Sequence, residues 1–403
     1  MSTSLLYRAF GVRGYEYRAA RFIDGQAVFE IRPSPGSLRC AVCRSPRVMK
    51  SGASERIFRH IPIGSKPVNL LVEIPRVECH DCGTVRQIPL GFAEPRVGYT
   101  RAFERYVFDL SRRMTMQDVV EHLLVGWDAV KDIVKRNLTR IFKKPKLCKL
   151  RRIAIDEISI GHGQRYLTVV LDLATGAVVF VGEGKGAEAL DPFWKRLRAS
   201  HARIEAVAID MSKAYIKAVS TNLPKAAIVF DHFHVVKLFN EKLSNLRREI
   251  YRTATKRHKK ILKGTRWLLL KLPKNLDERR NEGRRLRAAL RINEPLAAAY
   301  YMKEELRLFW EHGSKAEAKS FLHDWCARAD VSGIGMLIKF AKTLRDHEYG
   351  LLSWYDFQIS TGPLEGTNNK IKTLQRRAYG YRDQEFFKLL IYNLHNKRYE
   401  LVG

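Results

Sequence analysis

The sequence predicts an α/β core that a long helical stretch interrupts, preceded by a cysteine-rich domain and a helical domain. Three observations support this prediction. Strand-like and helix-like segments alternate in the order βββαβαβ between residues 152 and 230. From His234 to about Tyr349 the spacing of apolar residues is almost wholly helical. Four of the six cysteines form two close pairs in the first part of the chain.

The composition indicates a polyanionic partner. The chain has 403 residues, with 73 Lys and Arg against 42 Asp and Glu, which gives a formal charge of +31. This excess is far larger than solubility requires, so nucleic acid or an anionic membrane is expected. No run of about eighteen apolar residues appears, so we expect no membrane-spanning helix. The first residues also lack the pattern of a secretory signal, and nucleic acid is therefore the favoured partner.

The two cysteine pairs have the C-x-x-C spacing of zinc ligands. They are Cys40 with Cys43 and Cys79 with Cys82, and a strand-like segment, residues 68–78, lies between them. Two such pairs can supply four thiolates to one tetrahedral Zn²⁺. A redox dithiol is the alternative, but two matching pairs argue against it. We expect a zinc-ribbon-like domain within residues 1–95.

Residues 96–148 have the pattern of a helical DNA-binding domain. Thr115 is a candidate N-cap, Gly126 ends the helix that follows, and a second helix is expected from Trp127 to about Phe142. Two helices joined by a short turn are typical of a helix-turn-helix, and the alternative is a solvated helical hairpin. The predicted DNA contacts on the second helix are Lys131, Lys135, Arg136 and Arg140.

Two aspartates follow similar apolar runs in the α/β core. Asp156 and Asp210 each close a run that ends in Ile-Asp, and we expect both at strand ends, where α/β folds place their chemistry. The alternative is that each caps the next element, as Asp210 could cap the helix after it. Neighbouring carboxylates repel unless a cation lies between them, and carboxylate oxygens suit Mg²⁺. Two such acids in a strongly basic chain favour a functional site.

A third acid lies in the basic segment near the end of the chain. Glu365 follows Gly362 and Pro363, which fit the start of a helix, and steps along that helix bring Asn369, Lys372 and Arg376 to the same face. Glu365 could be a metal ligand, or it could complement the helix dipole. The predicted DNA contacts here are Lys370, Lys372, Arg376 and Arg377, and a solvated helix face is the alternative.

A further polar cluster follows the last predicted strand. Asp231 and His234 belong to the sequence DHFH, which leads into the helical stretch. His234 either packs at the start of that helix or, with Asp231, supports the catalytic centre. Asn369 is a further candidate for a supporting role.

These motifs together resemble the ISL3 family of insertion-sequence transposases. The resemblance covers essentially the whole chain, and the segments VFDHFHVVK and GPLEGTNNKIKTLQRRAYGYRD are its most specific parts. It implies an α/β ribonuclease-H-like catalytic core of the DDE type, interrupted by an all-α insertion and preceded by zinc-ribbon and helix-turn-helix domains. The implied catalytic triad is Asp156, Asp210 and Glu365. The implied parts of the core are residues 149–233 and 350–403, with the basic insertion at 234–349.

The resemblance also implies an activity and its partners. The protein would bind terminal inverted repeats and carry out strand cleavage and strand transfer into target DNA. It would use two Mg²⁺ or Mn²⁺ ions at the triad and a structural Zn²⁺ at the cysteines. It would act as a homodimer or larger assembly, without membrane, at the nucleoid in a bacterial cytoplasm. A DNA-binding regulator, and a ribonuclease-H-like nuclease or resolvase without strand transfer, are the alternatives.

Overall fold

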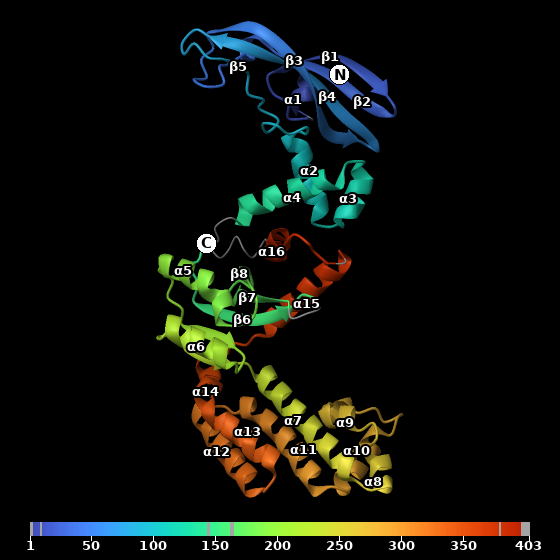
Figure 1. Cartoon of the computed structure of the whole chain (residues 1–403), viewed down its shortest axis with the longest axis vertical. Helices are drawn as coiled ribbons and strands as arrows, with labels where there is room; N and C mark the ends of the chain where they lie inside the picture. Colours follow the sequence, from blue (N-terminus) through green and yellow to red (C-terminus); the bar gives the residue numbers. More distant parts are fainter. Residues whose placement is uncertain (1–2, 9, 143–145, 162–164, 379, 396–403) are drawn as a thin grey trace. The chain divides into compact units, whose positions relative to one another are not determined.

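The chain divides into two compact units, Met1–Lys143 and Lys144–Gly403, which we describe one at a time (Figure 1). The structure is a computed structural model that describes residues 3–8, 10–142, 146–161, 165–378 and 380–395. Among the helices in these ranges, none is both long and apolar enough to cross a bilayer.

The first unit contains a five-stranded sheet with the order β1-β2-β4-β3, and β5 pairs with β4. Alternate residues of β4 from Val68 to Ile74 are buried, so the strand predicted at 68–78 is confirmed. Strands β1 and β2 were not predicted from the sequence. The elements are α1 (Thr3–Arg8), β1 (Tyr15–Ile23), β2 (Gln26–Pro33), β3 (Val48–Ile63), β4 (Lys66–Cys79) and β5 (Val85–Gln87).

Three helices complete the first unit: α2 (Arg101–Ser111), α3 (Met116–Leu123) and α4 (Trp127–Phe142). Thr115 caps α3 as predicted. Its Oγ1 accepts a hydrogen bond from the amide of Asp118 at 3.1 Å, and Oδ2 of Asp118 accepts one from the amide of Thr115 at 2.8 Å. This reciprocal pair is a capping box. The predicted bounds of α4 are confirmed.

The second unit is built on a five-stranded sheet with the order β10-β9-β6-β7-β8. β7 runs antiparallel to both of its neighbours, β6 and β8, and β9 runs parallel to β6 and β10. The predicted element order is confirmed. The sheet pairs the first strand along the chain, β6, with the fourth, β9. The elements are β6 (Arg152–Ser159), β7 (Tyr166–Asp172), β8 (Val178–Glu183), α5 (Asp191–Ala199), β9 (Ala206–Ile209), α6 (Lys213–Asn222) and β10 (Ala227–Phe230). The segment GHGQ, residues 161–164, is expected from the sequence to form a turn, and all of it but Gly161 lies outside the described residues.

Helices cover both faces of this sheet. Ile153 and Ile155 of β6 belong to one apolar cluster with residues of α5 and α6. Ala154 of β6 belongs to another, which includes residues of α15 (Gly362–Arg377) and α16 (Gln384–Asn393). Because successive strand residues point to opposite faces, the sheet is the middle layer of three.

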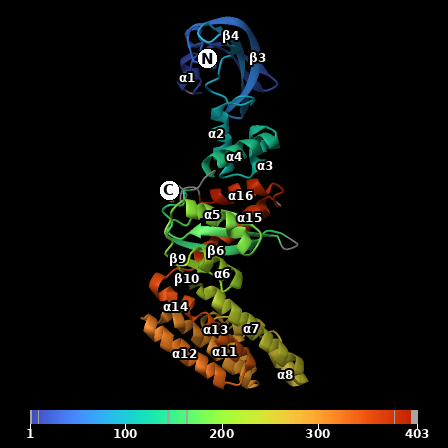
Figure 2. The same cartoon turned by 60° about the vertical axis from the view of Figure 1, so that its left-hand side comes forward.

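The chain between β10 and α15 is mostly helical, with short loops between the helices. Figure 2 shows α7 leading away from β10 toward α8, and α14 beside β10. The helical stretch is longer than the predicted one, from His234 to about Tyr349, because α7 begins at His232 and α14 continues to Phe357. The helices are α7 (His232–Thr253), α8 (Lys256–Leu262), α9 (Arg266–Leu270), α10 (Glu282–Arg291), α11 (Glu294–Leu306), α12 (Lys315–Val331), α13 (Gly335–Asp346) and α14 (Glu348–Phe357).

Packing explains the extra length of α14. This helix lies against β10, and a Cβ added to Gly350 would come within 2.4 Å of the ring of Phe230. Glycine therefore allows the helix to approach the strand closely. The close packing keeps the last helix of the stretch on the sheet until Gln358, which ends it in the left-handed conformation (φ 46°).

Candidate functional site

Asp156 and Asp210 lie at matching positions on neighbouring strands. In the parallel pair β6 and β9, Ala154 is opposite Ala208, and the same register two residues on brings Asp156 beside Asp210. Asp210 follows the last residue of β9, as predicted. Asp156 does not end its strand, because β7 continues to pair with β6 as far as Ser159 after β9 has stopped. That part of the prediction was wrong.

The structure contradicts the alternative that Asp210 caps the helix after it. The N-cap of α6 is Ser212, and Oδ1 of Asp210 accepts a hydrogen bond from the amide of Ser212 at 3.0 Å. Asp210 thus shapes the turn between β9 and α6. The hydrogen bond uses one carboxylate oxygen, so the second oxygen can bind a metal ion.

Helix α15 brings the third acid to the other two. It begins at Gly362 with Pro363 in its first turn, as predicted, and Glu365 lies in the same turn. One turn further on, Nδ2 of the buried Asn368 donates a hydrogen bond to Oδ2 of Asp156 at 2.8 Å. Asn368 was missed in the sequence, although a step of three residues from Glu365 leads to it. Its bond to Asp156 holds α15 against β6.

All three acids line one cavity of about 450 Å³. Glu157 lies there too, and its Oε2 accepts a hydrogen bond from the hydroxyl of Tyr215 at 3.2 Å. Lys237 and Lys372 line the cavity together with the acids. The other side chains of the lining are Ile158, Ser159, Tyr166, Phe233, His234, Lys237, Asn368, Asn369 and Lys372.

Burial and the neighbouring acids make ionisation of Asp156 more costly. Burial raises the pKa of Asp156 to about 6, and the charges of Asp210 and Glu157 act in the same direction. The amide of Glu157, which donates to Oδ1 of Asp156 at 2.8 Å, and the nearby His234 lower this pKa. Clustered carboxylates in a partly buried cavity suit a divalent cation, and all-oxygen donors suit Mg²⁺ or Mn²⁺.

Asp231 is a neighbour of this cluster. In the parallel pair β9 and β10, Ile209 is opposite Phe230, so the next residues, Asp210 and Asp231, are also matched. Asp231 is the N-cap of α7, without a hydrogen bond from its side chain to the helix, and His234 lies in the first turn. Donor atoms of Asp231, His234 and Glu365 all lie within 4.8 Å of one another. Asp231 and His234 therefore lie beside the acids, where a supporting role was predicted.

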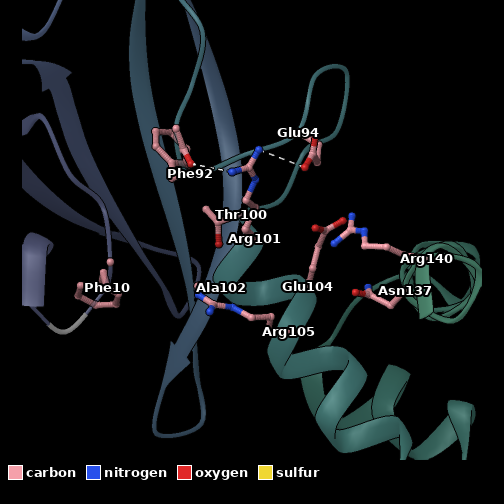
Figure 3. A pocket seen from close by; sticks show the side chains of 12 residues that line it. Phe10, Phe92, Glu94, Thr100, Arg101, Ala102, Glu104, Arg105, Asn137 and Arg140 are labelled. Atoms are coloured by element: carbon pink, nitrogen blue, oxygen red, sulfur yellow. Dashed lines mark hydrogen bonds and ion pairs between the residues drawn. The ribbon is translucent and has the colours of Figure 1, made fainter. Parts of the chain in front are cut away.

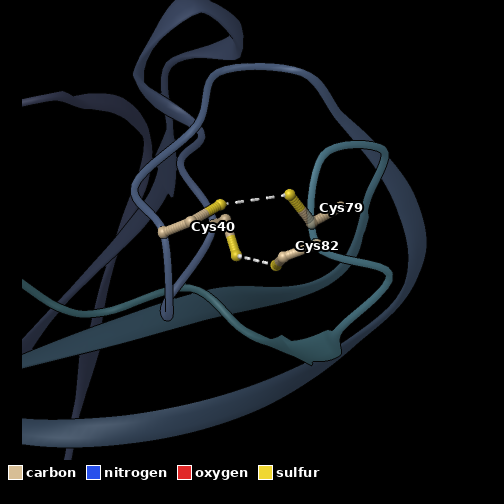
Figure 4. A group of neighbouring side chains, drawn as sticks. Cys40, Cys79 and Cys82 are labelled. Carbon is tan, nitrogen blue, oxygen red and sulfur yellow. Dashed lines mark hydrogen bonds between the residues drawn. The ribbon is translucent and has the colours of Figure 1, made fainter.

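The four cysteines of the C-x-x-C pairs form one cluster in the first unit (Figure 4). The Sγ atoms of Cys40 and Cys82 are 3.6 Å apart, and those of Cys43 and Cys79 are 3.4 Å apart. These contacts join one pair to the other, which disfavours two separate redox dithiols, and all four thiols are free. Zn–S bonds of about 2.3 Å require S···S edges of about 3.8 Å, so the cluster fits one tetrahedral Zn²⁺.

The predicted DNA-contact residues differ in their surroundings. On α4, Arg140 is exposed, whereas Nη1 of Arg136 pairs with the buried Glu104 of α2 at 3.1 Å and its Nη2 donates to the hydroxyl of Tyr99. Arg136 thus holds α4 to α2. Nζ of Lys131 lies 5.7 Å from the centre of the Trp127 ring, and Lys135 is half-buried. On α15 the exposed side chains include Asn369 and the four predicted contacts, Lys370, Lys372, Arg376 and Arg377.

Another cavity, of about 570 Å³, lies in the first unit beside α2 and α4 (Figure 3). Its acids are already paired with arginines. Glu94 pairs with Arg101 at 3.1 Å, and Glu104 pairs with Arg136 at the same distance. These pairs stabilise the joint between the sheet and the helices and provide no catalytic set.

Comparison with known proteins brings these features together. A family model described as a transposase matches residues 153–391, and the helix-turn-helix domain of transposase family ISL3 matches residues 88–136. The zinc-finger of transposase IS204/IS1001/IS1096/IS1165 matches residues 37–82, which include the four cysteines. The class of protein is therefore a DNA transposase with a DDE domain, a metal-dependent polynucleotidyl transferase and endonuclease with a zinc site.

The chain belongs to the ISL3 family of transposases. It is 33% identical over 365 residues to the transposase for insertion sequence element IS1001 of Bordetella parapertussis, covering 90% of this chain and 89% of the relative. It is 32% identical over 411 residues to the transposase for IS1557 of Mycobacterium tuberculosis, covering 94% and 91%. The Drosophila P element transposase strand transfer complex is 12% identical, with a TM-score of 0.33 over 67% of this chain and 82% of that chain.

Proposed function

We propose that this transposase binds the terminal inverted repeats of its insertion sequence, cleaves at the ends and joins them to target DNA, with Asp156, Asp210 and Glu365 as catalytic residues. The observation that carries the proposal is that these three acids, from β6, β9 and α15, line one cavity. The strand order β8-β7-β6-β9-β10, with helices on both faces, supports a ribonuclease-H-like core. In such a core the helices α7 to α14 form an insertion between the second acid and the third.

The carboxylates of the triad would hold two Mg²⁺ or Mn²⁺ ions. Ions in such a site supply an activated hydroxyl and stabilise the leaving oxygen of an in-line displacement. Asn368 donates to Oδ2 of Asp156 and so orients that carboxylate. The cysteine cluster would hold a structural Zn²⁺.

DNA backbone would lie against the exposed basic side chains near the cavity and on α4. Lys372 lines the cavity itself, and Lys370, Arg376 and Arg377 are exposed on the same helix, α15. Arg140 is the exposed candidate on α4. Contacts of this kind release counterions, so binding would weaken steeply with salt. Because two DNA ends must be paired, the active form would be at least a dimer. It would act at the nucleoid in the cytoplasm.

The test is a strand-transfer assay with linear DNA that carries the element's ends, a plasmid target, and Mg²⁺ or Mn²⁺. Transfer products are expected with the wild type and none with Asp156→Ala, Asp210→Ala or Glu365→Ala. The matched control is Asp324→Asn, an exposed acid on α12 that pairs with Arg328. Transfer that survives loss of any triad acid would overturn its assignment.

The same assay separates two other functions. A DNA-binding regulator would bind the ends and cut nothing with either metal ion. A nuclease or resolvase would cut but leave no joined product. The triad acids are needed in the nuclease as well, so the joined product is the deciding signal.

A further inference from the structure

The Asp231–His234–Glu365 cluster includes two residues that the proposed reaction does not use. Its donor atoms come from the first turn of α7, the residue before it, and the first turn of α15. In the described ranges it is one of two groups whose Asp, Glu, His or Cys donor atoms converge closely enough to hold a metal ion. The other group is the cysteine cluster.

Asp231 is buried, and one of its carboxylate oxygens has no hydrogen-bond partner. Its side chain is 1% exposed, and Oδ2 accepts a hydrogen bond from Oγ1 of Thr361 at 2.6 Å. Oδ1 has no hydrogen-bond partner and lies 3.4 Å from Nδ1 of the exposed His232. A buried carboxylate oxygen that lacks a partner is costly, so a missing ligand is indicated.

His234 also has a ring nitrogen without a hydrogen-bond partner. Its Nε2 is buried, has no hydrogen-bond partner and lies 4.0 Å from Oδ2 of Asp231. That separation is too long for a hydrogen bond. It is within the span of about 4.2 Å that two ligands can have when each lies about 2.1 Å from one ion.

Thr361 brings Glu365 to these two groups. The carbonyl of this buried residue accepts a hydrogen bond from the amide of Glu365 at 3.0 Å, while its hydroxyl is bonded to Asp231. The start of α15 is therefore held beside Asp231. Within the part of the chain that the structure describes, the carboxylate of Glu365 has no hydrogen bond or ion pair that would compete with a cation.

We propose that Asp231, His234 and Glu365 bind one divalent transition-metal ion. Two carboxylates and an imidazole form a mixed oxygen and nitrogen set, which favours ions such as Mn²⁺ or Zn²⁺ over Mg²⁺. The site shares Glu365 with the proposed catalytic triad and in that respect rests on the proposed function. An ion bound here holds Glu365 on the side of β10, and Thr361 orients the Asp231 ligand.

The test is Mn²⁺ binding to the full chain with its zinc retained and no DNA present, followed by pulsed electron paramagnetic resonance. The variant Asp156→Asn with Asp210→Asn removes the other two triad acids and leaves the proposed ligands. Circular dichroism checks that each variant is folded. In this background we expect one bound Mn²⁺ per chain with ¹⁴N modulation from an imidazole ligand.

Adding His234→Gln should remove the ¹⁴N modulation and raise the dissociation constant about tenfold or more. Adding His232→Gln, the matched control, should leave the modulation in place. Absence of modulation in the background protein, or its survival in His234→Gln, would overturn the proposal. Strand transfer plays no part in the readout, so failure here and failure of the proposed function are distinguishable.

Discussion

Nδ2 of Asn368 donates a hydrogen bond to Oδ2 of Asp156 at 2.8 Å, although the two residues are 212 positions apart in the sequence. The bond joins α15, which carries Glu365, to β6, which carries the first acid of the triad. A long helical stretch separates β6 and α15 in the sequence, but the two elements contact each other directly in the fold. The geometry of the triad therefore depends on the side-chain amide of Asn368, which is not one of the three acids.

Asn368→Ala is expected to slow strand cleavage by about 10- to 100-fold, because the Asp156 carboxylate and α15 lose their mutual orientation. Binding of DNA ends should change little. Single-turnover cleavage and a gel-shift titration measure the two effects. Thr373→Ala, at an exposed position of the same helix, is the control. Equal cleavage rates for wild type and Asn368→Ala would show that this bond does not orient the acid.

Glu365→Gln should preserve folding and DNA binding while it abolishes cleavage. The amide has the shape of the carboxylate but lacks its charge, so it is a poor ligand for Mg²⁺. Circular dichroism, DNA titration and cleavage with labelled ends give the three readouts. A Glu365→Gln protein that still cuts would mean that the third acid has been misassigned.

Two arginines on α4 should behave differently. Arg136→Ala leaves the buried Glu104 without its partner, and we expect the unfolding free energy of the first unit to fall by about 2 kcal/mol. Arg140→Ala, at an exposed position, should leave stability unchanged and reduce the slope of log affinity against log salt by about 1. Denaturant titration measures the unfolding free energy, and DNA binding at several salt concentrations measures the slope. A wild-type salt slope in Arg140→Ala would exclude Arg140 from the DNA contacts.

Replacement of Cys43 and Cys82 by Ser should remove the zinc, because only two thiolates of the cluster would remain. We expect one zinc ion per chain in the wild type and almost none in the variant, as measured by metal analysis. Hydrogen exchange should quicken in β5 and at the end of β4. Cys148→Ser changes an exposed cysteine of the second unit and should retain the metal. Full zinc content in the double variant would contradict the assignment.

The first unit should lose stability in acid through His60. Burial lowers the pKa of this side chain to about 4, and its Nδ1 lies 2.7 Å from Oγ1 of Thr100. Because the folded pKa is below the unfolded value of about 6.5, the unfolded state binds more protons between these values. The stabilisation is complete above pH 6.5 and is lost as the pH falls toward 4, by up to about 3 kcal/mol.

Hydrogen exchange of β3 and β4, corrected for intrinsic rates, follows this loss between pH 4.5 and 7. His60→Gln should flatten the pH dependence at matched zinc content, which separates His60 from acid release of the metal. A pH profile of the same steepness in wild type and His60→Gln would assign the effect to other groups.

The sequence alone determined the features that depend on local spacing. The C-x-x-C pairs predicted the cysteine cluster, and Thr115, Gly126 and the period of apolar residues predicted α3 and α4. Local rules also predicted the element order βββαβαβ along the core and the start of α15 at Gly362. Helix caps, the helical period and the spacing of metal ligands depend on a few neighbouring residues, so they can be recognised in a single sequence.

Only the tertiary structure decided what depends on register and long-range packing. It placed Asp156 within β6 and not at its end, since β7 continues to pair where β9 stops. It matched Asp210 with both Asp156 and Asp231, and brought Asn368 to Asp156. Strand register and the docking of α15 arise from contacts between segments far apart in the chain, and no local pattern encodes which side chains then meet.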